Sequence, residues 1–79
     1  MKLTFDPKYN IAYLKISEKS NAVNTVQVSD ELNVDLAPDG SVYGIEFMNA
    51  NEQLISQDGG KLVFLNNESG IEKEMVMQS

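Results

Sequence analysis

The sequence predicts a small, mainly β protein: an antiparallel β meander of about five strands. A short helix follows the last strand, and the C-terminal segment is uncertain, so an α+β class stays open. Three observations support this fold class. Apolar and polar residues alternate with a period of two in several short runs, turn-forming residues separate these runs, and the pattern changes after residue 47.

The clearest pattern is a hairpin over residues 32–47. In Leu32-Asn33-Val34-Asp35-Leu36 the apolar side chains fall on one face and the polar ones on the other. Pro38-Asp39-Gly40 then predicts a tight turn, because proline fixes φ and glycine accepts a positive φ. The returning strand has apolar residues on both faces, which favours a central position. Gly44 indicates a bulge or a close backbone approach.

The segments before this hairpin predict the other strands. They are residues 2–5, 11–17 and 22–29, separated by a turn at 6–10, a polar loop at 18–21 and a turn at Asp30-Glu31. Short strands with short connections most simply pair in sequence order, which gives the meander.

The last third of the chain has weaker patterns. Asn49, followed three positions later by Glu52, is close to a capping box and predicts a helix of about two turns, ended by Asp58-Gly59-Gly60. The apolar run over residues 61–65 predicts a buried strand or a buried turn of helix. Residues 71–79 fit either a helix or a strand, and the last of them are expected to be disordered.

Length and composition limit the class of protein. We expect one domain over residues 1–79, with a β core at 1–50 and a helical cap and variable C-terminal segment at 51–79. The chain has no cysteine, and we find no apolar run typical of a signal peptide or a membrane helix. We therefore expect a soluble, cytoplasmic protein without a membrane partner.

The charge pattern argues against nucleic-acid binding. Acidic residues number 12 against 6 basic ones, for a formal net charge of -6. All the basic residues are lysines, whereas arginine is the residue best suited to phosphates and base edges. The acidic residues are spread along the chain, which is typical of a solubilising surface.

The residue types also argue against catalysis. Without histidine and cysteine, the commonest bases, nucleophiles and transition-metal ligands are missing, so we expect no enzyme and no cofactor. Asp35, Asp39 and Glu46 are the remaining candidates for a weak divalent-cation site or an acid pair. The simpler interpretation makes Asp39 a turn residue and Asp35 a solvated side chain, and pairs Glu46 with Lys15 or another lysine.

Several short motifs in the first 50 residues carry a family resemblance. They are Phe5-Asp6-Pro7, the run 12–17, Val26-Gln27-Val28, the run 33–36, Gly40, Val42, the run 44–47 and Asn49-Ala50. In this order and spacing they resemble the bacterial domain of unknown function 2283 family. The resemblance implies a small, mostly antiparallel β domain and no established activity, substrate or cofactor. Small families of this kind can include members that sit beside toxin-like partners.

The function hypothesis is a non-catalytic module that binds another protein or itself, most simply as a homodimer. One short helix cannot cover both faces of a sheet, and the candidates for self-association are Tyr13, Leu62 and Phe64. The competing interpretation is that residues 61–77 fold back over the sheet of their own chain. The alternative functions are an antitoxin-like inhibitor of a small basic partner and a cation site at Asp35, Asp39 and Glu46.

Overall fold

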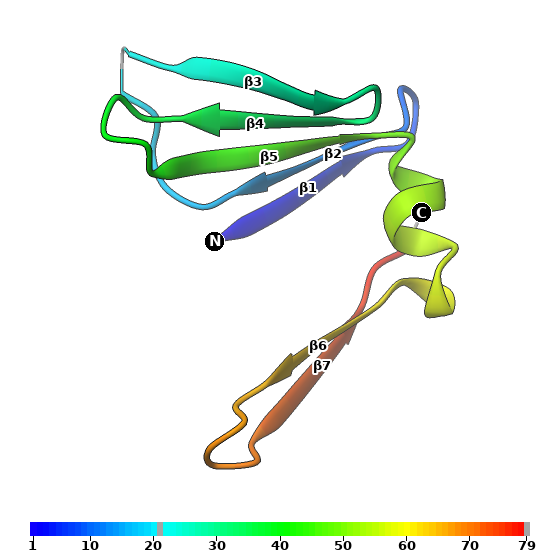
Figure 1. The fold of residues 1–79 in the computed structure, drawn as a ribbon. Coiled ribbons are helices and arrows are strands. Elements are labelled where there is room, and N and C mark those ends of the chain that lie inside the picture. The colour runs from blue at the N-terminus through cyan, green and yellow to red at the C-terminus, as the bar shows by residue number, and fades with distance from the viewer. Residues whose placement is uncertain (21, 79) are drawn as a thin grey trace.

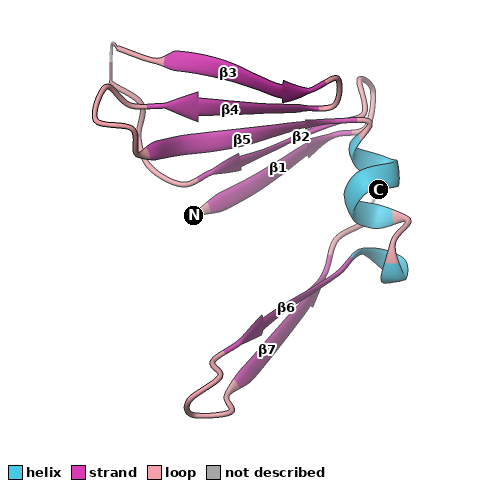
Figure 2. Cartoon of the chain, viewed as in Figure 1, coloured by secondary structure: helices cyan, strands magenta, loops and turns pink. Residues whose placement is uncertain are grey.

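The computed structural model describes residues 1–20 and 22–78 and has mainly β structure (Figure 1). Five strands form one sheet: β1 (Lys2–Asp6), β2 (Ile11–Lys15), β3 (Asn24–Ser29), β4 (Leu32–Leu36) and β5 (Val42–Met48). Two helical turns follow, the π-helical η1 (Asn51–Ile55) and the 3₁₀ turn η2 (Asp58–Gly60). A second sheet contains only β6 (Lys61–Leu65) and β7 (Glu72–Val76) (Figure 2).

The strand order of the large sheet is β1-β2-β5-β4-β3, and all neighbours are antiparallel. The predicted meander is therefore wrong in its order, because β5 lies between β2 and β4 and β3 is an edge strand. The predicted central position of β5 is confirmed. β3 suits an edge because its residues are all exposed, whereas β5 contains the buried residues Tyr43 and Gly44.

The turn between β4 and β5 forms as its residues predict. The Gly40 amide donates to the Ala37 carbonyl at 2.9 Å, and the Ala37 amide donates to the Ser41 carbonyl at 2.8 Å. Gly40 has a φ of 89°, which a residue without a Cβ adopts easily. This is a type I turn followed by a left-handed residue, a common three-residue hairpin loop.

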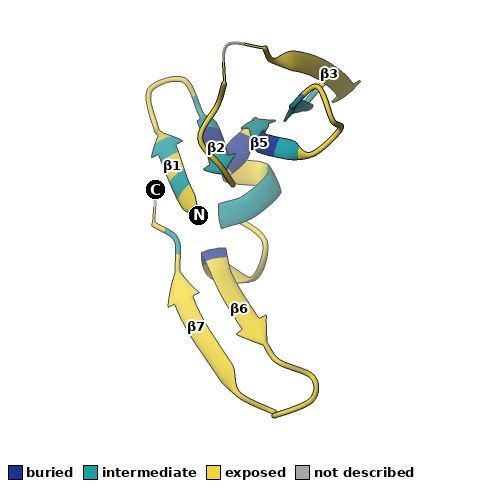
Figure 3. Ribbon diagram, turned by 90° about the vertical axis from the view of Figure 1, so that its left-hand side faces the viewer, coloured by how far each residue is buried: buried dark blue, intermediate teal, exposed yellow. Residues whose placement is uncertain are grey.

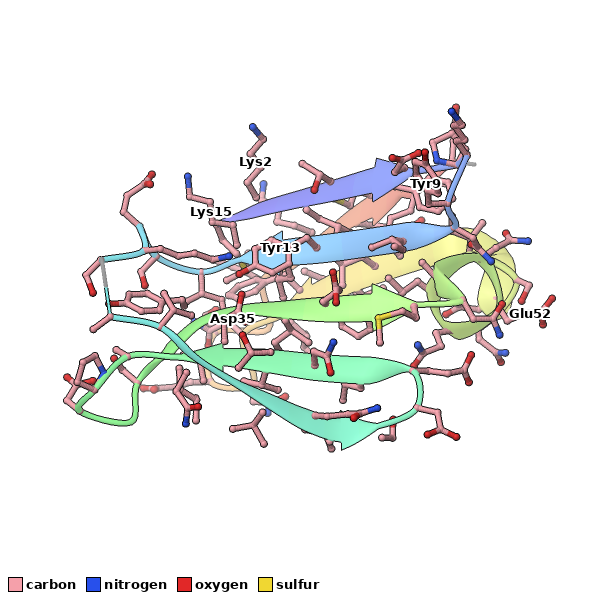
Figure 4. The ribbon with its side chains drawn as sticks, turned by 90° about the horizontal axis from the view of Figure 1, so that it is seen from above. Lys2, Tyr9, Tyr13, Lys15, Asp35 and Glu52 are labelled. Carbon is pink, nitrogen blue, oxygen red and sulfur yellow. The ribbon has the colours of Figure 1, made fainter. Side chains whose placement is uncertain are left out.

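Strand register gives the large sheet two different faces. On one face, aligned partners form a row across all five strands: Leu3, Leu14, Ile45, Val34 and Val26. Phe5, Ala12, Phe47 and Leu32 form a second row beside it. We call these two rows the apolar face. The opposite, polar face includes Tyr13 and Asp35, which Figure 4 shows from above.

The segment after β5 differs from the predicted two-turn helix. It is a single π-helical turn, and its N-cap residue Ala50 makes no side-chain capping bond. The predicted capping box is wrong because Asn49 has a φ of 52° and lies outside the turn. Asn10 supplies the missing acceptor from the β1–β2 turn, since its Oδ1 accepts from the Asn51 amide at 2.7 Å.

The predicted end of the helix at Asp58-Gly59-Gly60 is wrong in position, because η1 already ends at Ile55 and these three residues form the 3₁₀ turn η2. All three have positive φ values, of 42°, 70° and 77°. The chain then enters β6, and the Met77 amide returns after β7 to the Gly60 carbonyl at 2.8 Å. Gly60 is buried at this point. These contacts fix the base of the β6–β7 hairpin.

The β6–β7 hairpin, which we call the arm, projects away from the large sheet (Figure 1). Residues 61–65 do form a strand, but every one of them is exposed, so the predicted burial is wrong. Residues 72–76 resolve the ambiguity of the last segment in favour of a strand, also fully exposed. Asn21 of the predicted polar loop and Ser79 of the last segment lie outside the described residues. Over residues 1–20 and 22–78, no helix is long and apolar enough to cross a membrane.

Candidate functional site

The structure distributes the side chains singled out from the sequence over three places. Tyr13, Asp35 and Glu46 lie on the polar face, Asp39 lies in the β4–β5 turn, and Leu62 and Phe64 lie on the arm.

Asp35 is the centre of a hydrogen-bonded cluster on the polar face. Its Oδ2 accepts from the Tyr13 hydroxyl at 2.8 Å and lies 2.9 Å from the Lys19 ammonium, and its Oδ1 accepts from the Thr25 hydroxyl at 2.6 Å. Only 13% of its side chain is exposed. The interpretation of Asp35 as a solvated side chain is therefore wrong.

Gly44 makes this cluster feasible. Tyr13 is on β2 and Asp35 is on β4, so the phenol must pass over β5 to reach the carboxylate. A Cβ at Gly44 would collide with the Tyr13 ring, and the absence of a side chain lets the ring lie there. The close approach predicted for Gly44 is confirmed. Lys19 also lies over the Tyr13 ring, 4.6 Å from its centroid, in cation–π geometry.

The electrostatics of the cluster hold each group in its usual state near neutral pH. The hydrogen bond from Thr25, with those from Lys19 and Tyr13, lowers the pKa of Asp35. Desolvation, followed by the Asp35 carboxylate, raises the pKa of Tyr13. The hydrogen bond to Asp35 raises the pKa of Lys19. Carboxylate, phenol and ammonium thus stabilise one another, and the arrangement links the loop after β2 to three strands.

The other two carboxylates have local partners. Glu46 accepts from the Asn33 amide at 3.0 Å, so the pairing with a lysine is not observed. Lys15 is instead 2.6 Å from Glu18. Asp39 accepts from the Ser41 amide and hydroxyl at 3.0 and 2.7 Å, as a turn residue does.

The structure brings two of the three predicted cation ligands close to one another. A shallow depression is lined by Asp35 and Glu46 together with Tyr13, Lys19 and Thr25. Asp39 does not line it. Within the described part of the chain, no group of three or more histidine, cysteine, aspartate or glutamate side chains could hold a metal ion. Sequence reasoning missed Lys19 and Thr25, although the position of Thr25 opposite Asp35 on a paired strand was a usable signal.

The apolar face is covered only at its β1–β2 end. There a cavity of about 220 Å³ lies between the sheet, η1 and the base of the arm. It is lined by Leu3, Phe5, Ala12, Leu54, Ile55 and residues 75–78. Toward the other edge no described element covers the face, and Val26 on β3 is 39% exposed. Among the described residues, only Ala12, Tyr43 and Ala50 are buried hydrophobic residues (Figure 3).

The arm carries apolar side chains on both of its sides. Register places Leu62 and Phe64 on one side with Met75, and Val63 and Leu65 on the other. Phe64 is 65% exposed. A two-stranded hairpin in water is at best marginally stable by itself, so this one needs a packing partner.

Two measures of size agree with this incomplete packing. The chain exposes 5766 Å², about 1,000 Å² more than a compact monomer of this mass. Its radius of gyration is 14.1 Å, against about 12 Å for a compact chain of this length. The additional surface includes the exposed arm and the uncovered part of the apolar face.

These features define a small antiparallel β domain with one polar face, one partly covered apolar face and an appended β arm. The chain belongs to the family described as "Protein of unknown function (DUF2283)", whose model matches residues 2–51. The match runs from β1 to the first residue of η1, in agreement with the resemblance seen over residues 1–50. The arm lies outside it. Searches of curated proteins and of solved structures found no match to this chain.

Proposed function

We propose that this protein is a non-catalytic, self-associating module and that its working form is a homodimer. The observation that supports this most directly is the uncovered apolar surface. Its excess of about 1,000 Å² over a compact monomer is similar to the roughly 800 Å² that each partner buries in a stable protein complex. A second copy would remove this surface from water.

Two-fold symmetry is the simplest form of such an assembly, because the same patch then meets its own copy and no further surface is left open. Strand edges and apolar patches of this kind also promote uncontrolled aggregation when nothing covers them. A closed dimer would remove that hazard.

The non-catalytic part of the proposal is supported by the polar cluster. Each of the three groups around Asp35 already bonds to it, and the pKa shifts of Asp35 and Tyr13 lead away from neutrality. A general base or acid needs a pKa near the operating pH. The cluster therefore suits a structural role in the sheet.

Light scattering coupled to gel filtration, at low micromolar concentration, tests self-association. We expect a mass near twice the 8.8 kDa of one chain. A mass near 8.8 kDa at that concentration would overturn the proposal.

A further inference from the structure

Two apolar surfaces of this chain are exposed and do not cover each other. One is the β3–β4–β5 part of the apolar face, and the other is the arm. Figure 1 shows the arm below the sheet and pointing away from it, and Figure 4 shows the polar face from above, so the arm leaves the sheet on the side of the apolar face. Within one chain neither surface covers the other, but the arm of one copy could cover the apolar face of another.

We propose that two copies exchange their arms: the β6–β7 hairpin of each lies on the uncovered apolar face of the other. This rests on the proposed self-association and states which surfaces form the interface. The exchange is reciprocal, so one two-fold axis relates two identical contacts.

The dimensions of the two surfaces match. Five-residue strands are about 17 Å long, and two paired strands are about 10 Å wide. The uncovered region of β3, β4 and β5 has strands of five to seven residues and is about 14 Å wide. One arm therefore covers most of this region, leaving room for side chains at its margin.

The charges of the arm select the side that faces the partner. The side with Val63 and Leu65 also carries Lys61, Glu72 and Glu74. Lys61 and Glu74 form an exposed ion pair with atoms 3.3 Å apart. These charges belong in solvent, because burying them would cost several kcal/mol for each ion.

The other side of the arm is suited to an apolar contact. It carries Leu62, Phe64 and Met75, and its remaining residue is Lys73, whose long stem can lie along an apolar surface with the ammonium in water. The row Ile45, Val34 and Val26 on the partner's sheet is aliphatic throughout. Phe64 and Leu62 would pack against this row.

The base of the arm favours exchange between copies over folding back on its own sheet. Both ends of the hairpin are tied there, by the bond from Met77 to Gly60 and by the packing of residues 75–78 against β1, β2 and η1. Gly60 is left-handed, and a Cβ at this position would collide with the Met77 carbonyl. The arm of a second copy has no such constraint on its approach to the uncovered face.

Complementation between two variants tests the exchange. Phe64→Asp disables the arm, and Val26→Asp disables the receiving face at an exposed edge position where the strand should still fold. Each variant alone should dissociate at least tenfold more easily than the wild type. An equimolar mixture retains one intact contact, the Val26→Asp chain's arm on the Phe64→Asp chain's face, and should form heterodimers more tightly than either variant forms homodimers.

The control is Val63→Asp, on the solvent side of the same strand, which should leave the dimer intact while circular dichroism confirms the β content of all three variants. A wild-type dimer that survives Phe64→Asp would overturn arm exchange and favour sheet-to-sheet contact. One that survives Val26→Asp would overturn it in favour of arm-to-arm contact. A wild-type monomer would overturn self-association itself.

Engineered cysteines give a second readout that does not depend on destabilising the dimer. The chain has no cysteine, so single variants Phe64→Cys and Val26→Cys each carry one thiol. Oxidising an equimolar mixture should give mainly the mixed disulfide dimer, because the exchange brings these two positions together. Only like-with-like dimers, or no cross-link, would contradict the proposed contact.

Discussion

The Tyr13 hydroxyl crosses over Gly44 to donate a 2.8 Å hydrogen bond to Asp35. This contact connects β2 to β4 above the strand that separates them, and Lys19 and Thr25 complete the cluster from the loop after β2 and from β3. One missing side chain thus allows four separate segments to be joined on the polar face.

Adding a Cβ at Gly44 should disturb this arrangement. We expect Gly44→Ala to lower the free energy of unfolding by about 1–3 kcal/mol, because the methyl group overlaps the Tyr13 ring and the neighbours must shift. Urea denaturation measures the effect. In a Tyr13→Ala background the same substitution should cost much less, and equal costs in both backgrounds would show that the ring is not the obstacle.

Gly40 offers a different test, because a Cβ there would meet no atom within 4 Å. We expect Gly40→Val to destabilise the protein by about 1–3 kcal/mol through backbone strain alone, since its φ is 89°. Gly40→Asn is the matched control and should cost less, because asparagine tolerates the left-handed region. Thermal unfolding of both variants decides; an unchanged melting temperature for the valine variant would contradict the turn assignment.

The depressed pKa of Asp35 predicts acid sensitivity. A carboxyl group with a lower pKa in the folded state adds stability above its unfolded pKa, and this stability is lost as the pH falls through the folded pKa. Stability should therefore fall progressively as the pH drops below about 5. The unfolded chain then begins to bind protons at the usual aspartate pKa of about 3.9, while folded Asp35 binds them only at a lower pH. The free energy of unfolding measured over this range should depend less on pH in Asp35→Asn.

Thr25→Val should act in the same direction as Asp35→Asn, because the Thr25 hydrogen bond is the largest cause of the shift. Asp39 also has a lowered pKa, caused by its bonds to Ser41, so the wild-type curve contains more than one group. Asp39→Asn separates the two contributions. If the slope is the same in the wild type and in Asp35→Asn, the cluster does not set the acid response.

Divalent cations should not stabilise the protein. At low millimolar calcium or magnesium we expect no rise in melting temperature, since Asp35 is bonded to Lys19, Thr25 and Tyr13 and only Glu46 lies beside it. A rise of many degrees that Glu46→Gln abolishes would establish a cation site. Glu46→Gln can keep its bond from Asn33, so it should fold normally.

Hydrolytic activity provides the corresponding test of the non-catalytic proposal. We expect the purified wild type to show none against general glycoside and ester substrates. An activity removed by either Asp35→Asn or Glu46→Gln would mean that the pair acts as catalytic carboxylates. The Asp39→Asn variant is the control, because Asp39 lies in the turn, away from both.

The sequence by itself determined the local features of this protein. Period-two alternation located the five strands, Pro38-Asp39-Gly40 specified the turn, and Gly44 marked the close approach that the Tyr13 ring makes. The family resemblance over the first 50 residues was also readable. These features depend on residues a few positions apart, whose conformational preferences act without the rest of the fold.

Only the tertiary structure decided the rest. It placed β5 between β2 and β4, and it brought Lys19 to Asp35. It also made Asn10 the acceptor at the start of η1, in place of the predicted Asn49 cap. Each of these contacts joins residues that are distant in sequence. The exposure of β6 likewise depends on where the arm leaves the sheet, and an apolar run has the same sequence whether it is covered or not. Pairing and burial are properties of the whole chain, because each contact competes with every alternative partner for the same surface.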